Sequence, residues 1–409
     1  MSPLRLRFRS VAVLLAAAAI PMAAAPYEFV LSSATSVAQG DWEVTSTQLG
    51  IKTAIPFAVR QRRLHGGRQE GVDLIEIDNG RMQVAVIPTR GMSLYKATVD
   101  DVTLGWSSPV TEIVNPAFIN LENRGGLGWL DGFNELMVRC GVEWAGHPGV
   151  DQGRLLTLHG RIGNIPASRV TVVIDDVAPY RIYVRGVVAE QTFKFADFLL
   201  ETELSTEPGS SQFRINDTLT NRADYEREFQ IIYHGNFGPP LLGAGARLVA
   251  PTESVTPFDE RAMAGLRDWA TCSGPAAGFG EHVYMLTLHA GSDHRTAAML
   301  RNASGDRAIR LDYDVRALPC FTLWKNTDTL REGYVAGLEP GTGFPSPRAN
   351  ERAFGRVPKL AAGTRRIFVV DYTVLRSAAE VAQTARYIEQ LRDGREPLIT
   401  QAVPARRAP

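Results

Sequence analysis

The chain has 409 residues, with 44 basic and 44 acidic side chains and a formal net charge of zero. This length forms one large domain or two ordinary ones, and 44% hydrophobic residues are too many for a disordered chain. The balanced charge excludes a protein that binds nucleic acid through a phosphate-neutralising surface.

The first 25 residues have the pattern of a secretory signal peptide. Arg5, Arg7 and Arg9 form a positive n-region, residues 11–20 are an unbroken apolar run, and the alanines at 23–25 offer a small-residue cleavage site. The apolar run is shorter than the about 20 residues that a membrane span needs. We expect a periplasmic or secreted protein, with no membrane span after cleavage and a mature net charge of −3; an uncleaved anchor is the alternative.

Residues 26–409 resemble a single domain made of many short β-strands. Phe213, Ile215 and Leu219 fall on one face of their run, which is the period-two pattern of a half-buried strand, although Asp217 interrupts that face. Glycine and proline pairs separate the runs. The pattern favours an all-β fold, a large antiparallel sandwich. The predicted strands are Met82–Ile87, Val170–Ile174, Arg181–Val188, Phe198–Leu204, Phe213–Leu219, Phe229–Tyr233, Val283–His289, Ala297–Leu300, Ala308–Tyr313 and Ile367–Tyr372.

A glycine-rich loop at residues 125–135 mixes aromatic and acidic side chains. Trp129 could give a sugar ring a flat apolar face, while Glu135 hydrogen-bonds its hydroxyl groups. A packed loop that only shapes a pocket wall is the alternative. Asp131 and Glu135 could also be a glycosidase acid pair, but nothing in the sequence places them on opposite sides of a bond.

The three cysteines, Cys140, Cys272 and Cys320, are too few to staple a scaffold of this size. In an oxidising compartment they would form one disulfide and leave one free thiol, or remain reduced and buried. The sequence does not select a pairing.

Three segments place a polar group beside glycine or proline. His159 stands in Leu-His-Gly-Arg, His234 precedes Gly235 and Asn236 at a predicted strand end, and Glu339 stands just before a Pro-Gly turn. Each could be a structural residue that only pins its turn. Together they suit general acid–base chemistry, because a histidine can donate a proton near neutrality and a carboxylate can accept one. Opening a hemiacetal needs such a pair and no cofactor.

Arginines beside glycine could grip sugar hydroxyls or a carboxylate with their planar donors. Arg90 and Arg161 have this placement, and Lys325, beside Trp324, has a similar claim. Ion pairs at the surface or within a sheet are the alternative. If both arginines face the pocket, an acidic or oxidised sugar is favoured over plain galactose.

One helix is predicted at residues 377–393. Ser377 is a good N-cap, Glu380 completes a capping box, and Gly394 suits the position after the last turn. A largely apolar stripe runs along the predicted helix. Its members are Val381, Thr384, Ala385, Ile388 and Leu391.

Six motifs, in order along residues 45–373, resemble the aldose 1-epimerase (galactose mutarotase-like) superfamily, and within it a bacterial mutarotase-like branch. They are Pro88-Thr89-Arg90-Gly91-Met92, Trp106-Ser107-Ser108-Pro109, Leu158-His159-Gly160-Arg161, Tyr233-His234-Gly235-Asn236, Trp324-Lys325 and Leu338-Glu339-Pro340. The resemblance implies a β-supersandwich and a small-molecule carbohydrate as partner. It also implies Glu339 as the base, His234 as the acid that protonates the ring oxygen, and His159 as a binder of sugar hydroxyls.

The chain departs from the better-known mutarotases at two points. Gly-Asn-Phe follows His234 in place of the usual aromatic-Phe-Asn order, and no equivalent of a substrate-binding aspartate is evident, although Lys325 and Asp328 lie in that region. Two alternatives therefore stand beside an epimerase. One is a carbohydrate-binding module without turnover. The other is a sugar isomerase or lyase in which His159, His234 and Glu339 hold a divalent metal.

Overall fold

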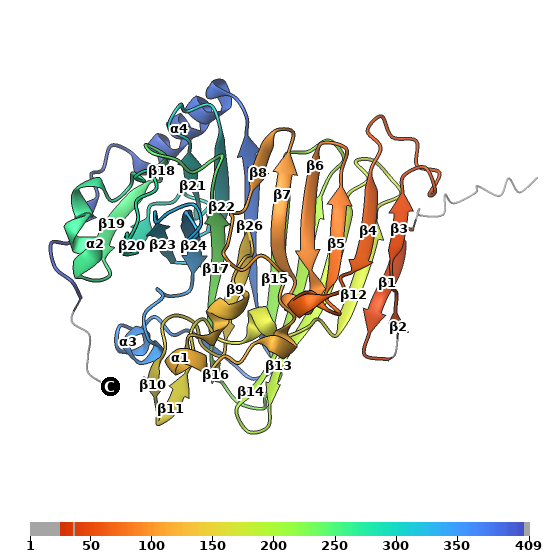
Figure 1. Ribbon diagram of the computed structural model, residues 1–409, viewed down its shortest axis with the longest axis horizontal. Helices are drawn as coiled ribbons and strands as arrows, with labels where there is room; N and C mark the ends of the chain where they lie inside the picture. The colour runs from red at the N-terminus through yellow and green to blue at the C-terminus, as the bar shows by residue number, and fades with distance from the viewer. Residues whose placement is uncertain (1–24, 36, 405–409) are drawn as a thin grey trace, which may run out of the picture.

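The fold is built on two large sheets, which the computed structural model shows face to face, with β3 to β9 in front of β12 to β15 in Figure 1. The structure describes residues 25–35 and 37–404, so the predicted signal peptide lies outside the described residues except for its last position. Except for the parallel β19–β27 pair, the strand pairs in both sheets are antiparallel. The prediction of an all-β, large antiparallel sandwich is confirmed.

The ten-stranded sheet runs, in spatial order, β18 (Arg247–Val249), β21 (Arg295–Arg301), β22 (Ala308–Asp314), β26 (Arg365–Leu375), β15 (Gln212–Asn221), β14 (Ala196–Thr206), β13 (Ile182–Thr192), β12 (Arg169–Ile174), β1 (Tyr27–Ser33) and β2 (Val37–Ala38). The thirteen-stranded sheet runs β27 (Leu398–Ile399), β19 (Thr252–Pro257), β20 (His282–Leu288), β23 (Cys320–Asn326), β24 (Val335–Gly341), β17 (Gln230–Phe237), β9 (Met137–Val142), β7 (Ser93–Val99), β6 (Met82–Ile87), β5 (Asp73–Asp78), β4 (Ala58–Arg63) and β3 (Trp42–Thr45), with β8 (Val102–Leu104) on β7.

Short elements complete the described chain. The pairs β10 (Gly149–Asp151) with β11 (Arg154–Leu156) and β16 (Arg227–Glu228) with β25 (Lys359–Leu360) form two small sheets. The helices are α1 (Asn123–Gly126), α2 (Glu260–Ala264), α3 (Arg348–Ala353) and α4 (Ala378–Arg392). The 3₁₀ turns are Gly67–Gln69, Pro88–Arg90, Pro116–Phe118, Gly128–Gly132, Ile162–Asn164 and Leu266–Asp268.

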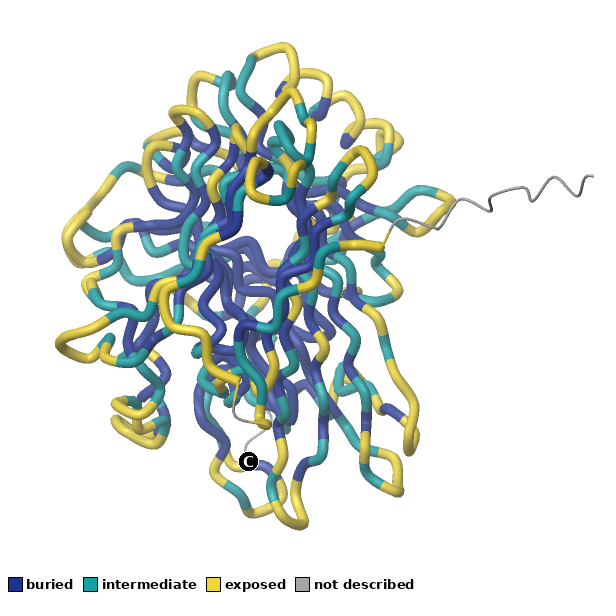
Figure 2. The backbone as a smooth tube through the Cα atoms, turned by 90° about the vertical axis from the view of Figure 1, so that its right-hand side faces the viewer, coloured by how far each residue is buried: buried dark blue, intermediate teal, exposed yellow. Residues whose placement is uncertain are grey.

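The main core lies between the two sheets, because alternate side chains of each strand point inward. Leu200 and Phe213 contribute from one sheet, and Val84 and Phe321 from the other. Figure 2 shows the buried backbone in the interior and the exposed backbone mainly in the peripheral loops.

Asp217, which breaks the apolar face of its strand, is explained by a buried ion pair across the core. Arg139 on β9 donates from Nη2 to Asp217 Oδ1 on β15 at 2.9 Å, and the Tyr233 hydroxyl donates to Asp217 Oδ2 at 2.7 Å. Thr202 Oγ1 and the carbonyl of Met92 accept the remaining guanidinium protons at 2.7 and 3.0 Å. The polar residue thus joins the two sheets.

All ten predicted strands overlap observed ones, but one candidate segment differs from its prediction. Glu339 does not precede a Pro-Gly turn: it lies inside β24, where Pro340 and Gly341 are also strand residues. Every residue of β24 is buried, and packing on both faces outweighs the local turn preference of Pro-Gly.

The C-terminal helix α4 closely matches its prediction. Ser377 Oγ accepts from Glu380 N at 3.2 Å, and the Glu380 carboxylate accepts from Arg376 N, one residue before the N-cap. The helix ends at Asp393, a left-handed C-cap, and Gly394 follows it with φ of 67° at the position predicted for a glycine. The helix packs on the outer face of the ten-stranded sheet, beside Ala297 and Met299 of β21.

Two sequence questions are answered by burial and helix length. The three cysteines, at 140, 272 and 320, are all free and buried. Of the helices in the described ranges, none combines the length and the apolar character required to cross a membrane.

Candidate active site

A cavity lies on the outer face of the thirteen-stranded sheet, over β20, β23, β24 and β17. The period-two alternation of the strands determines which side chains reach it. In β24, Leu338 belongs to the core between the sheets, while its neighbour Glu339 faces outward. In β17, Tyr233 points into the core and His234 into the cavity.

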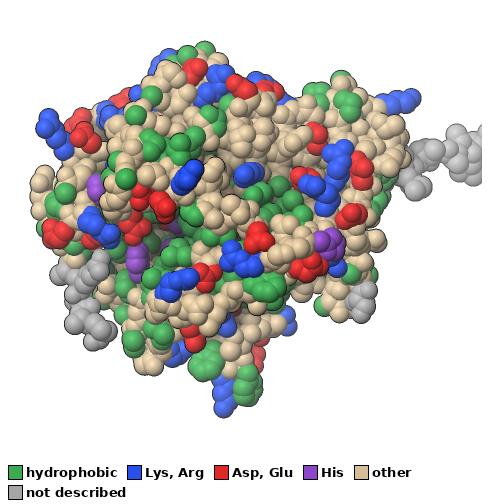
Figure 3. Space-filling model, in the orientation of Figure 1, with side chains coloured by type: hydrophobic (Ala, Val, Ile, Leu, Met, Phe, Trp, Pro, Cys, Tyr) green, Lys and Arg blue, Asp and Glu red, His purple; other side chains and the backbone are tan. Residues whose placement is uncertain are grey.

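Loops from elsewhere in the chain close the cavity. Its volume is about 220 Å³. Figure 3 shows histidine side chains in a hollow of this face, next to acidic and hydrophobic side chains. The lining residues are Leu127, Trp129, Leu130, Phe133, His147, Leu158, His159, His234, Glu281, Val283, Thr322, Trp324, Glu339 and Pro345.

His234 and Glu339 form the polar centre of the cavity. His234 Nε2 lies 3.3 Å from Glu339 Oε1, and the two side chains are 6% and 2% exposed. Asn236 Nδ2 donates to the carbonyl oxygens of Glu135 and His234 at 3.0 and 3.1 Å. The amide oxygen of Asn236 is thereby turned toward His234 Nδ1, at 2.8 Å. His234 therefore carries a proton on Nδ1, and Nε2 is the nitrogen that exchanges protons beside Glu339.

Burial drives both members of this pair toward their neutral forms. Desolvation lowers the pKa of His234 from 6.5 to about 4. Desolvation, with a smaller contribution from the charge of Glu281, raises the pKa of Glu339 well above its usual range. The pair therefore holds one exchangeable proton near neutrality, and opposite displacements of two neighbouring pKa values are typical of acid–base sites.

His159 approaches the same centre from the loop after β11. Its ring lies 5.3 Å from the ring of His234, centroid to centroid, and its backbone has φ of 59°, a left-handed conformation that non-glycine residues adopt rarely. Burial, followed by the charges of His234 and His147, lowers its pKa well below the usual range. A neutral imidazole can both donate and accept hydrogen bonds.

Aromatic rings surround His234 on several sides. The ring of Phe133 lies 5.4 Å from it, that of Trp324 5.5 Å and that of Trp129 6.1 Å, centroid to centroid. These rings exclude water and offer flat apolar faces. The result is a mostly apolar pocket with a few convergent polar groups, the usual character of a small-molecule site.

Several polar atoms of the lining residues are left without an internal partner. Among the described residues, Glu339 Oε1, His159 Nδ1, Trp129 Nε1 and Thr322 Oγ1 are buried and have no hydrogen-bond partner. Buried polar groups are nearly always paired in folded proteins. This concentration in one cavity indicates groups that are kept for a bound polar molecule.

The structure brings together four of the nine predicted site residues. His159, His234, Glu339 and Trp129 all line the cavity, although they are separated by more than two hundred positions in the chain. Asn236 lies behind His234 and orients it, so it supports the site without lining it.

The predicted placement of Arg90 and Glu135 is corrected. Both side chains are 0% exposed and pair with each other, with Arg90 Nη2 2.6 Å from Glu135 Oε1. Arg90 Nη1 also donates to the carbonyl of Val114 at 3.0 Å. Asp131 contacts Arg124 instead of forming an acid pair with Glu135.

Arg161 and Lys325 are also turned away from the cavity lining. Arg161 contacts Glu143 and Glu190 at 3.6 and 3.4 Å. Lys325 Nζ donates to the carbonyl of Thr271 at 3.1 Å, because its side chain points to the opposite face of β23 from Trp324. With both arginines in ion pairs, the condition that favoured an acidic sugar is not met.

Glu281 is a polar lining residue that the sequence interpretation missed. Its Oε2 accepts from Trp324 Nε1 at 2.9 Å, and its carboxylate borders the cavity just before β20. The sequence does contain a feature that could have identified Glu281, because this carboxylate directly precedes an apolar strand. His234 was selected for a similar reason, its place at the end of a predicted strand. His147 was also missed; its Nδ1 donates to the carbonyl of Pro345 at 2.6 Å.

The arrangement does not form a metal centre. Across residues 25–35 and 37–404, no three His, Cys, Asp or Glu side chains are placed to hold one metal ion. The polar groups are arranged as an acid–base pair with a nearby second imidazole.

Comparisons with known proteins show the family and the fold. The matching family model covers residues 69–374 and is described as a "Domain of unknown function (DUF4432)". The crystal structure of a "putative aldose 1-epimerase" from Klebsiella pneumoniae has 44% sequence identity and a TM-score of 0.92, covering 94% of this chain and 100% of its own. A galactose mutarotase-like protein from Clostridium acetobutylicum has 12% identity and a TM-score of 0.52, covering 78% and 98%, and shows the fold alone. No curated protein matches the chain.

Proposed function

Since the chain belongs to the DUF4432 family and, with it, to the aldose 1-epimerase (galactose mutarotase-like) superfamily, we propose that it interconverts the anomers of a free sugar. The chemistry is general acid–base catalysis, with the sugar bound in the cavity over β17 and β24. The distance of 3.3 Å between His234 Nε2 and Glu339 Oε1 carries the proposal.

That distance suits the geometry of a hemiacetal. The ring oxygen and the anomeric hydroxyl are bonded to the same carbon, so an acid and a base that serve both must lie on the same small region of the cavity surface. General acid–base catalysis also requires hydrogen-bond reach to each proton. His234 and Glu339 lie close enough to each other to serve the two oxygens of one bound sugar.

The proton inventory balances over a full cycle. Glu339 as carboxylate takes the proton of the anomeric hydroxyl, while protonated His234 gives its Nε2 proton to the ring oxygen and the ring C–O bond breaks. The open-chain aldehyde then rotates about its first C–C bond and presents its other face. His234 takes back the hydroxyl proton, Glu339 returns its proton to the carbonyl oxygen, and the ring closes as the other anomer.

The neutral pair that burial favours is one of the two forms in this cycle. A protonated Glu339 beside a neutral His234 is the state that accompanies the open-chain sugar. The ring form needs the proton on His234 and a carboxylate at Glu339, so one proton must pass from Glu339 to His234 as the sugar binds. The unpartnered nitrogen of His159, the Thr322 hydroxyl and the Glu281 carboxylate are available for sugar hydroxyls.

Export is part of the proposal. It is supported by the arginines at 5, 7 and 9 and the apolar run that follows them. Burial raises the pKa of Cys272 to about 11 and that of Cys320 to about 12, so free thiols at these sites stay protonated and unreactive in an oxidising compartment. The full-length gene is expressed, and the periplasmic and cytosolic fractions are compared. Recovery in the periplasm of a protein about 25 residues shorter than the whole sequence would support export. Full-length protein in the cytosol would contradict it.

Anomer exchange measured by NMR tests the activity. Purified protein is added to a panel of free aldoses and uronic acids, and exchange between the α and β signals is followed. We expect acceleration with at least one sugar and its loss in Glu339→Gln. No acceleration with any sugar would contradict the proposal, and calorimetric binding without exchange would identify a carbohydrate-binding protein instead.

A further inference from the structure

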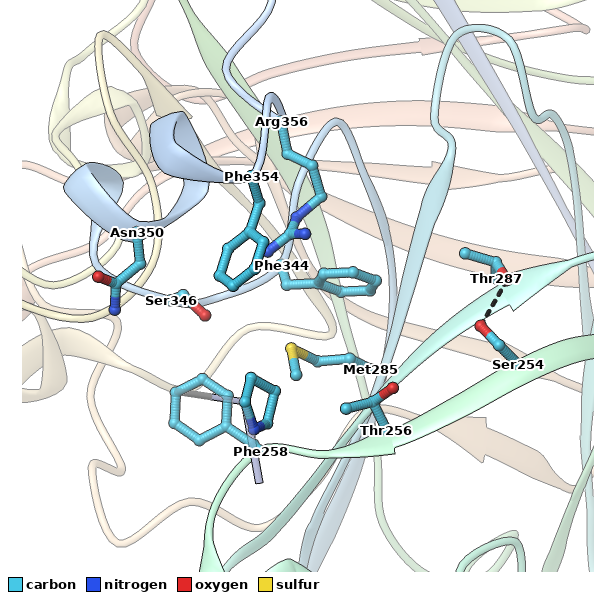
Figure 4. A pocket seen from close by; sticks show the side chains of 11 residues that line it. Ser254, Thr256, Phe258, Met285, Thr287, Phe344, Ser346, Asn350, Phe354 and Arg356 are labelled. Carbon is cyan, nitrogen blue, oxygen red and sulfur yellow. Dashed lines mark hydrogen bonds between the residues drawn. The ribbon is translucent and has the colours of Figure 1, made fainter. Parts of the chain in front are cut away.

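A second cavity lies on the same outer face of the thirteen-stranded sheet (Figure 4). Its volume is about 230 Å³, close to that of the first. β19, β20 and the segment around α3 form its walls, and the C-terminal end of the described chain borders it. The lining residues are Ser254, Thr256, Phe258, Met285, Thr287, Phe344, Ser346, Asn350, Phe354, Arg356 and Pro404.

The linings of the two cavities adjoin each other. His147 lines the first cavity and stacks on Phe258 of the second, with ring centroids 5.0 Å apart and planes at 26°. Pro345 lines the first cavity, and its two chain neighbours line the second. Along β20, Val283 and Met285 face the two cavities in turn, and two residues of a strand span about 7 Å. One linkage between sugar rings bridges such a distance.

The second cavity has the amphipathic character that sugar rings require. Figure 4 shows Phe344 and Phe354 on one side and Phe258 on the other, with Met285 between them. A row of hydroxyl groups borders the aromatic surface, including Ser254 and Thr287, whose oxygens are 2.7 Å apart. Apolar ring faces pack against aromatic rings, and hydroxyls hydrogen-bond with the polar row.

The charge in this cavity is already neutralised. Arg356 donates from Nε and Nη2 to the two carboxylate oxygens of Glu351, each at 2.7 Å. Its guanidinium also lies 5.0 and 4.5 Å from the rings of Phe344 and Phe354. A bidentate ion pair leaves no free cation for a phosphate or a carboxylate, which favours a neutral ligand.

We propose that the second cavity binds a neutral sugar unit linked to the sugar in the first cavity, so that the substrate is a reducing disaccharide or longer oligosaccharide. The reducing-end ring binds in the first cavity against His234 and Glu339, and the next ring contacts the aromatic wall around Phe354. The substrate class rests on the proposed function, while the binding preference is tested without it.

Calorimetry with matched sugars tests the second cavity. Glucose is compared with maltose and cellobiose, and mannose and galactose with their homodisaccharides. We expect the preferred disaccharide to bind about tenfold more tightly than its monosaccharide, the effect of one added aromatic contact surface. In Phe354→Ala the preference falls to about twofold or less. Phe193→Ala, which removes a phenyl ring that is 86% exposed on the β13–β14 turn, keeps it.

A filling variant gives an independent result. Asn350→Trp extends a side chain from α3 into the second cavity, and it should abolish the disaccharide preference while leaving monosaccharide binding unchanged. Equal affinities for mono- and disaccharides in the natural protein would overturn the proposal, as would a preference that survives both variants. Disaccharide preference without anomer exchange would contradict the proposed epimerase activity and support the second sugar site.

Discussion

Two neighbours on β17, Tyr233 and His234, belong to two buried polar clusters with opposite properties. On the inner face, Tyr233, Arg139 and Asp217 satisfy one another and join the sheets. On the outer face, His234 and Glu339 lie close together, yet Glu339 Oε1 keeps no hydrogen-bond partner among the described residues. A buried cluster in which the polar atoms are hydrogen-bonded to one another is typical of a structural role. Buried polar atoms that lack a hydrogen-bond partner and face a cavity indicate a site that a ligand completes.

The largest expected effect separates activity from stability on the outer face. His234→Gln keeps a polar side chain of similar length but cannot transfer a proton, so the exchange rate should fall by about 10²- to 10⁴-fold. The free energy of unfolding should stay within about 1 kcal/mol or rise, since a buried titratable group is removed. NMR exchange and urea unfolding measure the two quantities.

His65→Gln is the matched control, because its side chain is 71% exposed and does not line the cavity. It should change neither quantity. Exchange at the natural rate in His234→Gln would show that the outer cluster is not the proton-transfer pair.

The inner cluster should respond in the opposite sense. Asp217→Asn keeps the shape of the side chain but leaves the Arg139 charge buried without its counter-ion, which costs about 3–5 kcal/mol of unfolding free energy. Asp197→Asn is the control: Asp197 is 36% exposed and lies 4.0 Å from the exposed Arg222, so its loss should cost less than about 1 kcal/mol. Equal costs for the two variants in urea unfolding would contradict the structural role of the inner cluster.

Acidic pH should reduce the contribution of His234 to the stability of the protein. The pKa of His234 falls from 6.5 to about 4 on folding, so between these values the unfolded state binds more protons and stability decreases as the pH is lowered. From pH 7 to pH 5 this contribution amounts to about 2 kcal/mol. Glu339 acts in the other direction: its raised pKa means that stability is lost as the pH rises through the folded value.

The pH effect can be isolated with the same variant. The difference in unfolding free energy between the natural protein and His234→Gln should change by about 2 kcal/mol between pH 7 and pH 5. A difference that stays constant over this range would show that His234 does not titrate as its burial implies.

The comparison also explains what the sequence could predict. Runs such as Met82–Ile87 were found because β-branched residues and period-two alternation are local properties. β9 was not predicted, because Arg139 and Gly141 interrupt its apolar sequence. The strand is nevertheless entirely buried, since the Arg139 guanidinium is paired with Asp217 across the core. Glu339 was found as a residue but assigned to a turn, since the local Pro-Gly preference gives no hint of burial in β24.

The site residues also divide into those that local sequence features predict and those that depend on contacts distant in sequence. The two histidines and Glu339 were singled out because each stands beside glycine or proline, and the family resemblance then implied their roles. The sequence interpretation wrongly placed Arg90 in the pocket. Its ion-pair partner Glu135 lies 45 positions away, and no local sequence pattern predicts that the two residues meet. Glu281 was overlooked because its contact with Trp324 joins strands that are distant in sequence.

The smallest expected effect tests whether the two faces of β17 are independent. Tyr233→Phe removes only the hydroxyl that donates to Asp217 Oδ2 at 2.7 Å, while Arg139 still pairs with that carboxylate. The loss of one buried hydrogen bond to a charged group should cost about 1–3 kcal/mol of unfolding free energy. The exchange rate should stay unchanged, because the hydroxyl lies on the core side of the strand.

Tyr225→Phe is the control for removal of a phenolic hydroxyl, because Tyr225 is 57% exposed; this variant should change the unfolding free energy by less than about 0.5 kcal/mol. If Tyr233→Phe slowed exchange as strongly as His234→Gln in a folded protein, the inner cluster would take part in catalysis and the separation of the two faces would be wrong.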